Sequence, residues 1–130
     1  MATLLIVDDD AALAEGLCEV LEEEGFACWP AADANEALRR LHCESNPPDF
    51  ILADLRMPGM AAFELLRIVR TTPGWSQVAF VLMTAGIEDD VPLGIPVDGL
   101  LLKPFGIEQL LHALRSALQH RRSEDAAASA

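Results

Sequence analysis

The sequence predicts one α/β domain, built on a doubly wound, five-stranded parallel sheet with helices on both faces. Its 130 residues are enough for one domain around one hydrophobic core. Five short apolar runs predict strands, and the segments between them carry apolar residues at helical spacing. Because strand and helix alternate along the chain, the strands are expected to run parallel and to be joined by helical crossovers.

The strands are predicted from apolar runs that polar or turn-forming residues bound. The first run is apolar almost throughout, which is typical of a strand buried on both faces. Pro30 follows the second run and places that strand at an edge, because proline donates no ladder hydrogen bond. The predicted strands span residues 3–7, 26–29, 49–53, 78–83 and 100–102.

The helices are predicted from apolar periodicity together with capping residues. Asp10 is expected to cap the first helix and Gly25 to end it. Asp33, followed three residues later by Glu36, resembles a capping box at the start of the second helix. The predicted helices span residues 11–24, 33–44, 60–70 and 107–119, and the small residues of 122–130 predict a flexible, frayed tail.

Charge and composition narrow the classes of function. The formal net charge of −12 argues against a phosphate backbone as partner, which requires clustered Lys and Arg, so we expect no nucleic acid. No apolar run reaches about 18 residues, so neither a membrane span nor a membrane partner is predicted. Cys18, Cys28 and Cys43 are odd in number and lack metal-ligand spacing, which indicates reduced thiols in a cytoplasmic protein.

Five residues suited to chemistry stand at the carboxyl ends of the predicted strands. Asp8 and Asp9 follow the first strand and Asp54 the third. Thr84 follows the fourth strand and Lys103 the fifth. In doubly wound folds ligands bind at this edge of the sheet. Each residue alone has an ordinary explanation as a turn or loop residue, but their joint occurrence predicts a functional site.

The three carboxylates predict a magnesium-dependent phosphoryl acceptor. Clustered carboxylates repel one another unless a cation joins them, and their hard oxygen ligands suit Mg²⁺. Asp54 is the most central nucleophile, and Lys103 and Thr84 can contact the oxygens of an incoming phosphoryl group. The set therefore predicts an aspartyl phosphate on Asp54.

Four stretches of sequence carry a family resemblance: LLIVDD at residues 4–9, DLRMPGM at 54–60, VLMTA at 81–85 and KPF at 103–105. Together they resemble the receiver domains of two-component response regulators, over about residues 3–120. The resemblance implies a flavodoxin-like fold with strand order 2-1-3-4-5. We therefore expect a receiver domain over residues 1–121, followed by a tail at 122–130.

The resemblance also implies partners and roles in phosphoryl transfer. Asp54 would accept a phosphoryl group from a sensor histidine kinase or a histidine phosphotransfer protein. Lys103 would hold that group, and Thr84 would be drawn toward it as a switch residue. The movement would change a distant surface that contacts an unidentified downstream protein.

The same resemblance implies a set of metal ligands. Mg²⁺ would be bound directly by Asp9 and Asp54 and by the backbone carbonyl of Arg56, with Asp8 acting largely through water. The chain would catalyse only its own phosphorylation and dephosphorylation, so we do not expect an enzyme that acts on other substrates.

The segment between Thr84 and Lys103 departs from the family pattern. It contains Gly86, Pro92, Gly94, Pro96 and Gly99. Proline costs a helix interior about 3 kcal/mol and glycine about 1 kcal/mol, so the fourth helix of the family is predicted to be shortened or missing. Leu100 stands where the family usually has an aromatic switch residue, so the usual coupling of threonine to aromatic cannot operate in its ordinary form.

Two other functions stay open. Asp8 and Asp10 after an apolar strand resemble the aspartate motif of the haloacid-dehalogenase-like phosphatases. Against that function, the chain has no obvious room for a substrate-selecting cap. The irregular 86–99 segment and Leu100 suit a receiver-like module that works without phosphorylation. Against that module, an unused cluster of carboxylates costs stability through repulsion. We expect a receiver that signals through protein contacts, either on its own or cut from a longer protein.

Overall fold

The computed structural model describes residues 2–56, 61–85 and 97–129. In these residues strands and helices alternate as predicted up to the fourth strand, and no helix is described between the fourth and fifth strands. Five parallel strands form one sheet in the order β2-β1-β3-β4-β5, as the family resemblance implies. The strands are β1 (Thr3–Val7), β2 (Ala27–Ala31), β3 (Phe50–Asp54), β4 (Ala79–Thr84) and β5 (Gly99–Leu102). The helices among the described residues are α1 (Ala11–Glu23), α2 (Ala34–Cys43), α3 (Ala62–Thr71) and α4 (Ile107–Ser129).

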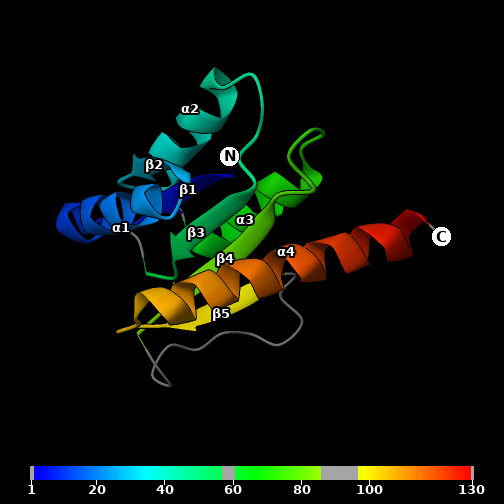
Figure 1. Ribbon diagram of the computed structural model, residues 1–130. Helices are drawn as coiled ribbons and strands as arrows, with labels where there is room; N and C mark the ends of the chain where they lie inside the picture. The colour runs from blue at the N-terminus through cyan, green and yellow to red at the C-terminus, as the bar shows by residue number, and fades with distance from the viewer. Residues whose placement is uncertain (1, 57–60, 86–96, 130) are drawn as a thin grey trace.

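Hydrophobic side chains pack on both faces of the sheet, with α2 and α3 on one face and α1 and α4 on the other (Figure 1). Leu5 and Val7 of β1 lie in a cluster with α2 and α3, the α2/α3 cluster. Leu4 and Ile6 lie in a cluster with α1 and α4, the α1/α4 cluster. Successive side chains of a strand point to opposite faces of the sheet. Because helices cover both faces, each buried strand needs a continuous apolar run. β2 is an edge strand, as predicted, but it continues through Pro30 to Ala31 rather than ending at Trp29.

The predicted capping residues act at two helix starts and one helix end. The Asp10 carboxylate accepts a hydrogen bond from the Leu13 N–H at 3.1 Å, and Asp33 accepts one from the Glu36 N–H at 2.7 Å. Such caps each stabilise a helix by about 1 kcal/mol. Gly25 follows α1 with φ of +95°, a conformation that favours glycine.

The last helix is longer than predicted. We expected it to end at Gln119, whereas α4 continues to Ser129, through most of the segment expected to be frayed. The added part is rich in alanine, which has the highest intrinsic helix propensity, so its small residues favour helix rather than fraying. The domain boundary at residue 121 stays a prediction.

Two predictions fall largely outside the described residues. The shortened fourth helix concerns residues 86–99, of which 86–96 are not described. The dipeptide Pro58-Gly59 also predicts a turn behind Asp54, and it lies in 57–60, which are likewise not described. Among the described residues between Thr84 and Gly99, none is helical.

Candidate functional site

Three carboxylates meet at the carboxyl edge of the sheet. Asp8 follows β1 directly, and Asp54 is the last residue of β3, the strand that pairs with β1. One carboxylate oxygen from each of Asp8, Asp9 and Asp54 lies within 4.8 Å of the others. Asp8 is buried, Asp54 is half-buried and Asp9 is exposed, so the cluster opens to solvent on the Asp9 side. The structure therefore brings together the acidic residues that the sequence singled out.

Lys103 reaches these carboxylates from the loop after β5. Its Nζ donates to Asp8 Oδ2 at 2.9 Å and to Asp54 Oδ2 at 3.3 Å. The other oxygens accept from the backbone: Asp10 N–H donates to Asp8 Oδ1 at 2.9 Å, and Arg56 N–H to Asp54 Oδ1 at 3.3 Å. The Lys103–Pro104 peptide bond is cis. One ammonium thus bridges the acids that end β1 and β3.

The pKa values show how the cluster balances charge. Burial raises the pKa of Asp54 above its ordinary 3.8, and repulsion from Asp8 adds to this, while Lys103 and the Arg56 N–H oppose it without cancelling it. For the Lys103 ammonium, burial alone would lower the pKa. Hydrogen bonding to Asp8 and attraction from both acids outweigh burial, and the pKa of Lys103 is raised. Because one ammonium faces three clustered carboxylates, the cluster favours a further cation.

Thr84 ends β4 and is buried. Its carbonyl oxygen accepts a hydrogen bond from the Lys103 backbone N–H at 2.7 Å, which ties the end of β4 to the start of the lysine loop. In the sheet register Asp54 pairs with Met83, so Thr84 stands one residue beyond the position opposite Asp54. The structure places threonine, lysine and aspartate on neighbouring strand ends.

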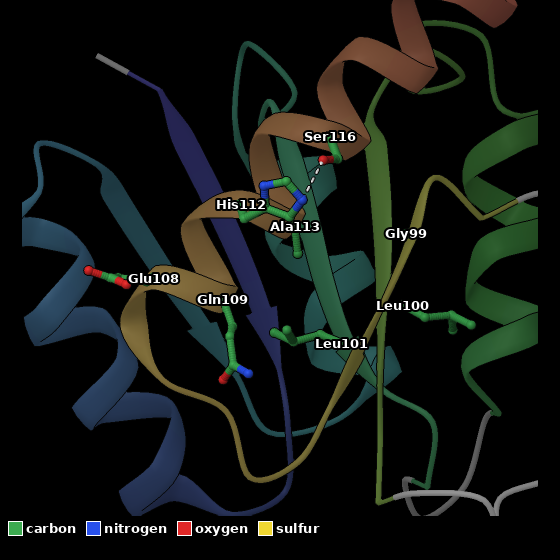
Figure 2. A pocket seen from close by; sticks show the side chains of 8 residues that line it. All are labelled: Gly99, Leu100, Leu101, Glu108, Gln109, His112, Ala113 and Ser116. Carbon is green, nitrogen blue, oxygen red and sulfur yellow. Dashed lines mark hydrogen bonds between the residues drawn. The ribbon is translucent and has the colours of Figure 1, made fainter.

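Leu100 lies on β5 with 52% of its surface exposed. Its side chain and that of Leu101 project from opposite faces of the strand, and Leu101 turns toward α4 (Figure 2). An exposed leucine at this position makes no buried contact of the kind expected for an inward-turned aromatic. Its role as a switch residue stays a prediction.

Among the grooves that border β5 and the loop after it, two differ in their relation to the acidic cluster. The first lies between β5 and α4 (Figure 2), and its described lining residues are Gly99, Leu100, Leu101, Glu108, Gln109, His112, Ala113 and Ser116. None of these belongs to the acidic cluster. The second groove is apolar and is shared between α1 and the loop after β5: Leu13, Leu17, Pro104 and Phe105 line it together with Lys103. The second groove therefore adjoins the candidate site, and the first does not.

Comparison with known proteins agrees with this arrangement. A family model described as "Response regulator receiver domain" matches residues 4–115. The chain belongs to the response regulator receiver domain family. Among solved structures, this receiver domain is similar to chemotaxis response regulator CheY4 of Vibrio cholerae, with a TM-score of 0.81, 29% identity and coverage of 91% of this chain and 99% of that one. It is also similar to TrrA from Thermotoga maritima in complex with Mg(2+)-BeF, with a TM-score of 0.78, 28% identity and coverage of 91% and 100%.

Two curated relatives extend the comparison to longer regulators. The receiver domain is 38% identical over 125 residues to "DNA-binding response regulator MtrA" of Mycobacterium tuberculosis, covering 94% of this chain and 52% of that protein. It is 33% identical over 127 residues to "Response regulator MprA" of Mycobacterium bovis, covering 97% and 54%. The chain thus spans about half the length of these two relatives.

These relatives overturn one expectation about partners. We excluded nucleic acid because of the net charge of −12, yet MtrA is a DNA-binding response regulator. The exclusion is wrong because net charge describes only the surface of these 130 residues. A receiver can take part in a DNA-binding regulator without touching the phosphate backbone itself.

Within the described part of the receiver domain, no helix has the length and apolar character needed to cross a bilayer.

The receiver domain also contains a buried charged cluster that the sequence analysis missed. Asp98 precedes β5, and its side chain is fully buried. It accepts hydrogen bonds from Arg70 Nη2 at 2.6 Å and from the Phe80 N–H at 2.8 Å. His120 Nδ1 lies 2.7 Å away and Arg121 Nη1 lies 3.8 Å away. These partners tie α3, β4 and α4 together at the amino end of β4, opposite the acidic edge.

Sequence alone offered little signal for this second cluster. Asp98 is one acidic residue before an apolar strand, and its side-chain partners Arg70 and His120 stand 28 and 22 positions away along the chain. Periodicity identifies faces of helices but does not pair residues across elements. The cluster therefore becomes visible only once α3 and α4 are packed on the sheet.

Proposed function

We propose that this receiver domain accepts a phosphoryl group on Asp54 in a Mg²⁺-dependent reaction, with a phosphohistidine of a sensor histidine kinase or phosphotransfer protein as donor. The observation that supports this most directly is the position of Lys103 Nζ between Asp8 and Asp54, beside three carboxylates within 4.8 Å of one another. A nucleophile, a set of metal ligands and a cation for the transferred oxygens are then adjacent.

The donor set fits Mg²⁺, which favours oxygen ligands and keeps several waters. Both oxygens of Asp8 already accept hydrogen bonds, from Asp10 N–H and from Lys103, so Asp8 suits a contact through water. Asp9 is exposed and suits a direct contact, as does Asp54. The backbone carbonyl of Arg56 would complete the protein ligands. When bound, Mg²⁺ would neutralise charge on the transferring oxygens.

In the proposed step an Asp54 carboxylate oxygen attacks phosphorus while the phosphorus–nitrogen bond to the donor imidazole breaks, and the imidazole leaves with the bond electrons. Lys103 would move from Asp54 Oδ2 to an oxygen of the transferred group, and the Thr84 hydroxyl would contact another. The apolar groove beside Lys103 offers a surface on which a protein donor could rest.

The output of the domain is part of the same proposal. The chain would catalyse only its own phosphorylation and dephosphorylation. It would act in the cytoplasm, and the signal would pass by surface contacts to a downstream protein or domain. The support is membership of the receiver family together with the pairing of Thr84 and Lys103 backbones at the sheet edge.

The test is incubation with acetyl phosphate and Mg²⁺, read by intact mass. Wild type should gain one PO₃ group, and Asp54→Asn should gain none. Asp49→Asn is a matched control, because Asp49 is an exposed acid that accepts the Thr3 N–H near the opposite end of β3. Equal gain in Asp54→Asn would refute the proposal.

Two other outcomes point to the alternative functions. No gain in wild type would favour an interaction module that works without phosphorylation. Steady turnover of a phosphate ester, lost in Asp8→Asn and kept in Asp54→Asn, would favour a phosphatase.

A further inference from the structure

Cys18 and Cys28 face one another between α1 and β2. Their Sγ atoms are 2.6 Å apart, and both thiols are free. Both side chains belong to the packing of the α1/α4 cluster, Cys18 as a buried member and Cys28 as a half-buried neighbour. The turn at Gly25, with its positive φ, folds β2 back along α1 and brings together two residues that stand ten apart in sequence.

We propose that Cys18 and Cys28 form a dithiol pair that peroxide oxidises to an intramolecular disulfide, which links α1 covalently to β2. This inference does not rest on the proposed phosphorylation. Because no side chain separates the two sulfurs, the bond requires little movement of the helix or the strand. A disulfide length is about 2.05 Å, so the sulfurs need to approach by a fraction of an ångström.

The oxidation is a two-step exchange that consumes one peroxide. One cysteine sulfur attacks a peroxide oxygen, the oxygen–oxygen bond breaks, and the first water leaves a sulfenic acid behind. The second sulfur then attacks the first, the sulfur–sulfur bond forms, and the sulfenic oxygen departs as a second water with the remaining thiol proton. Two electrons pass from the thiols to the peroxide, which is reduced to water.

The environment of the pair indicates a slow reaction rather than a fast one. Burial raises the pKa of the Cys18 thiol, and it raises that of the Cys28 thiol further. The thiolate is the reactive form, so little of it is present at neutral pH. The half-buried position of Cys28 still gives a small oxidant access to the pair.

Cys43 cannot replace either member of the pair within one chain. It is exposed at the end of α2, and α2 packs on the opposite face of the sheet from α1. Any disulfide through Cys43 would therefore join two chains. This difference allows the third thiol of the protein to serve as an internal reference.

The experiment counts thiols before and after exposure to hydrogen peroxide over several hours. The protein is then unfolded, alkylated and weighed intact. Untreated protein should take three alkyl groups, since it has three cysteines. Oxidised protein should lose two hydrogens and take one alkyl group, on Cys43. Non-reducing peptide mapping should join the Cys18 and Cys28 peptides, and dithiothreitol should reverse the change.

Two variants and the peptide map make the outcome decisive. Cys43→Ser should still lose two hydrogens and then take no alkyl group. Cys28→Ser should lose the intramolecular link. Should that variant fail to fold, the wild-type peptide map decides alone. The proposal is overturned if wild type keeps three reactive thiols, if the map shows only links through Cys43, or if Cys18 and Cys28 become sulfinic acids without a link.

Discussion

Lys103 Nζ lies 2.9 Å from Asp8 Oδ2, so the ammonium that follows β5 is held by the carboxylate that follows β1. The same atom lies 3.3 Å from Asp54 Oδ2, at the end of β3, the strand that neighbours β1 in the sheet. Lysine therefore occupies the side of Asp54 on which an incoming phosphoryl group would need positive charge. The first three of five predictions concern this arrangement, and the last two concern other parts of the fold.

The first prediction concerns Lys103. Lys103→Met should slow phosphorylation by a small donor by on the order of 10²-fold, the usual effect of removing one donor to the transferring oxygens. The initial rate of mass gain measures this. Arg122→Met, which removes an exposed cation from α4, should keep the wild-type rate. A wild-type rate in Lys103→Met would show that the ammonium is not used in transfer.

The second prediction concerns pH and Asp54. Because the pKa of Asp54 is raised in the folded protein, its protonated form stabilises the fold below the ordinary pKa of 3.8, and this contribution is lost as pH rises through the higher folded value. In metal-free buffer Asp54→Asn should therefore be more stable than wild type at neutral pH, and the difference should shrink as pH falls toward 3.8. Denaturant unfolding at several pH values measures it, and a less stable Asp54→Asn at neutral pH would contradict it.

The third prediction concerns the metal. Mg²⁺ at about 100 times its dissociation constant should raise the free energy of unfolding of wild type by about 2.7 kcal/mol. Asp9→Asn should lose most of this gain, because Asp9 is the exposed carboxylate of the cluster. Glu23→Gln, an exposed acid at the end of α1, is the control and should retain it. Equal stabilisation of Asp9→Asn and wild type would exclude Asp9 as a ligand.

The fourth prediction concerns the buried cluster around Asp98. Asp98→Ala should lower the free energy of unfolding by about 3–5 kcal/mol, because it leaves Arg70 partly buried without this carboxylate. Glu19→Gln, an exposed acid of α1, should change it by less than about 0.5 kcal/mol. Comparable small effects of the two substitutions would mean that the cluster adds little to stability.

The fifth prediction compares adjacent leucines of β5. Leu101 is 5% exposed, so Leu101→Ala should cost about 2–5 kcal/mol, the range for a core leucine. Leu100 is 52% exposed, so Leu100→Ala should cost less than about 0.5 kcal/mol. Urea unfolding of both variants measures the contrast. A large cost at Leu100 would show that its side chain is covered in solution.

The parts of the structure that sequence predicted share a physical origin. Buried parallel strands need uninterrupted apolar residues, and their carboxyl ends share one edge. The runs that end at Asp8, Asp54, Thr84 and Lys103 therefore predict both the sheet and which residues meet at its edge. The positions of the caps Asp10 and Asp33 were likewise local signals, since each accepts from an N–H three residues later.

The parts that the sequence did not predict depend on packing between elements or on small differences in free energy between alternative conformations. Asp98 acquires its partners from α3, β4 and α4 only in the folded chain. The approach of Cys18 to Cys28 depends on how β2 folds back on α1, and spacing alone gave no sign of it. The extension of α4 to Ser129 depends on the helix propensity of a segment of small residues. In such a segment the helical and frayed conformations differ by little free energy.

The alternation of side chains along β3 constrains the length of this strand. Leu52 packs in the α1/α4 cluster and Ala53 in the α2/α3 cluster, so each step along the strand changes the face of the sheet. Deleting one residue between Phe50 and Ala53 would reverse that alternation and turn the Asp54 carboxylate away from Asp8. Surface connections can gain or lose residues without this effect. Insertions and deletions should therefore be tolerated better in loops away from the acidic edge than within β3.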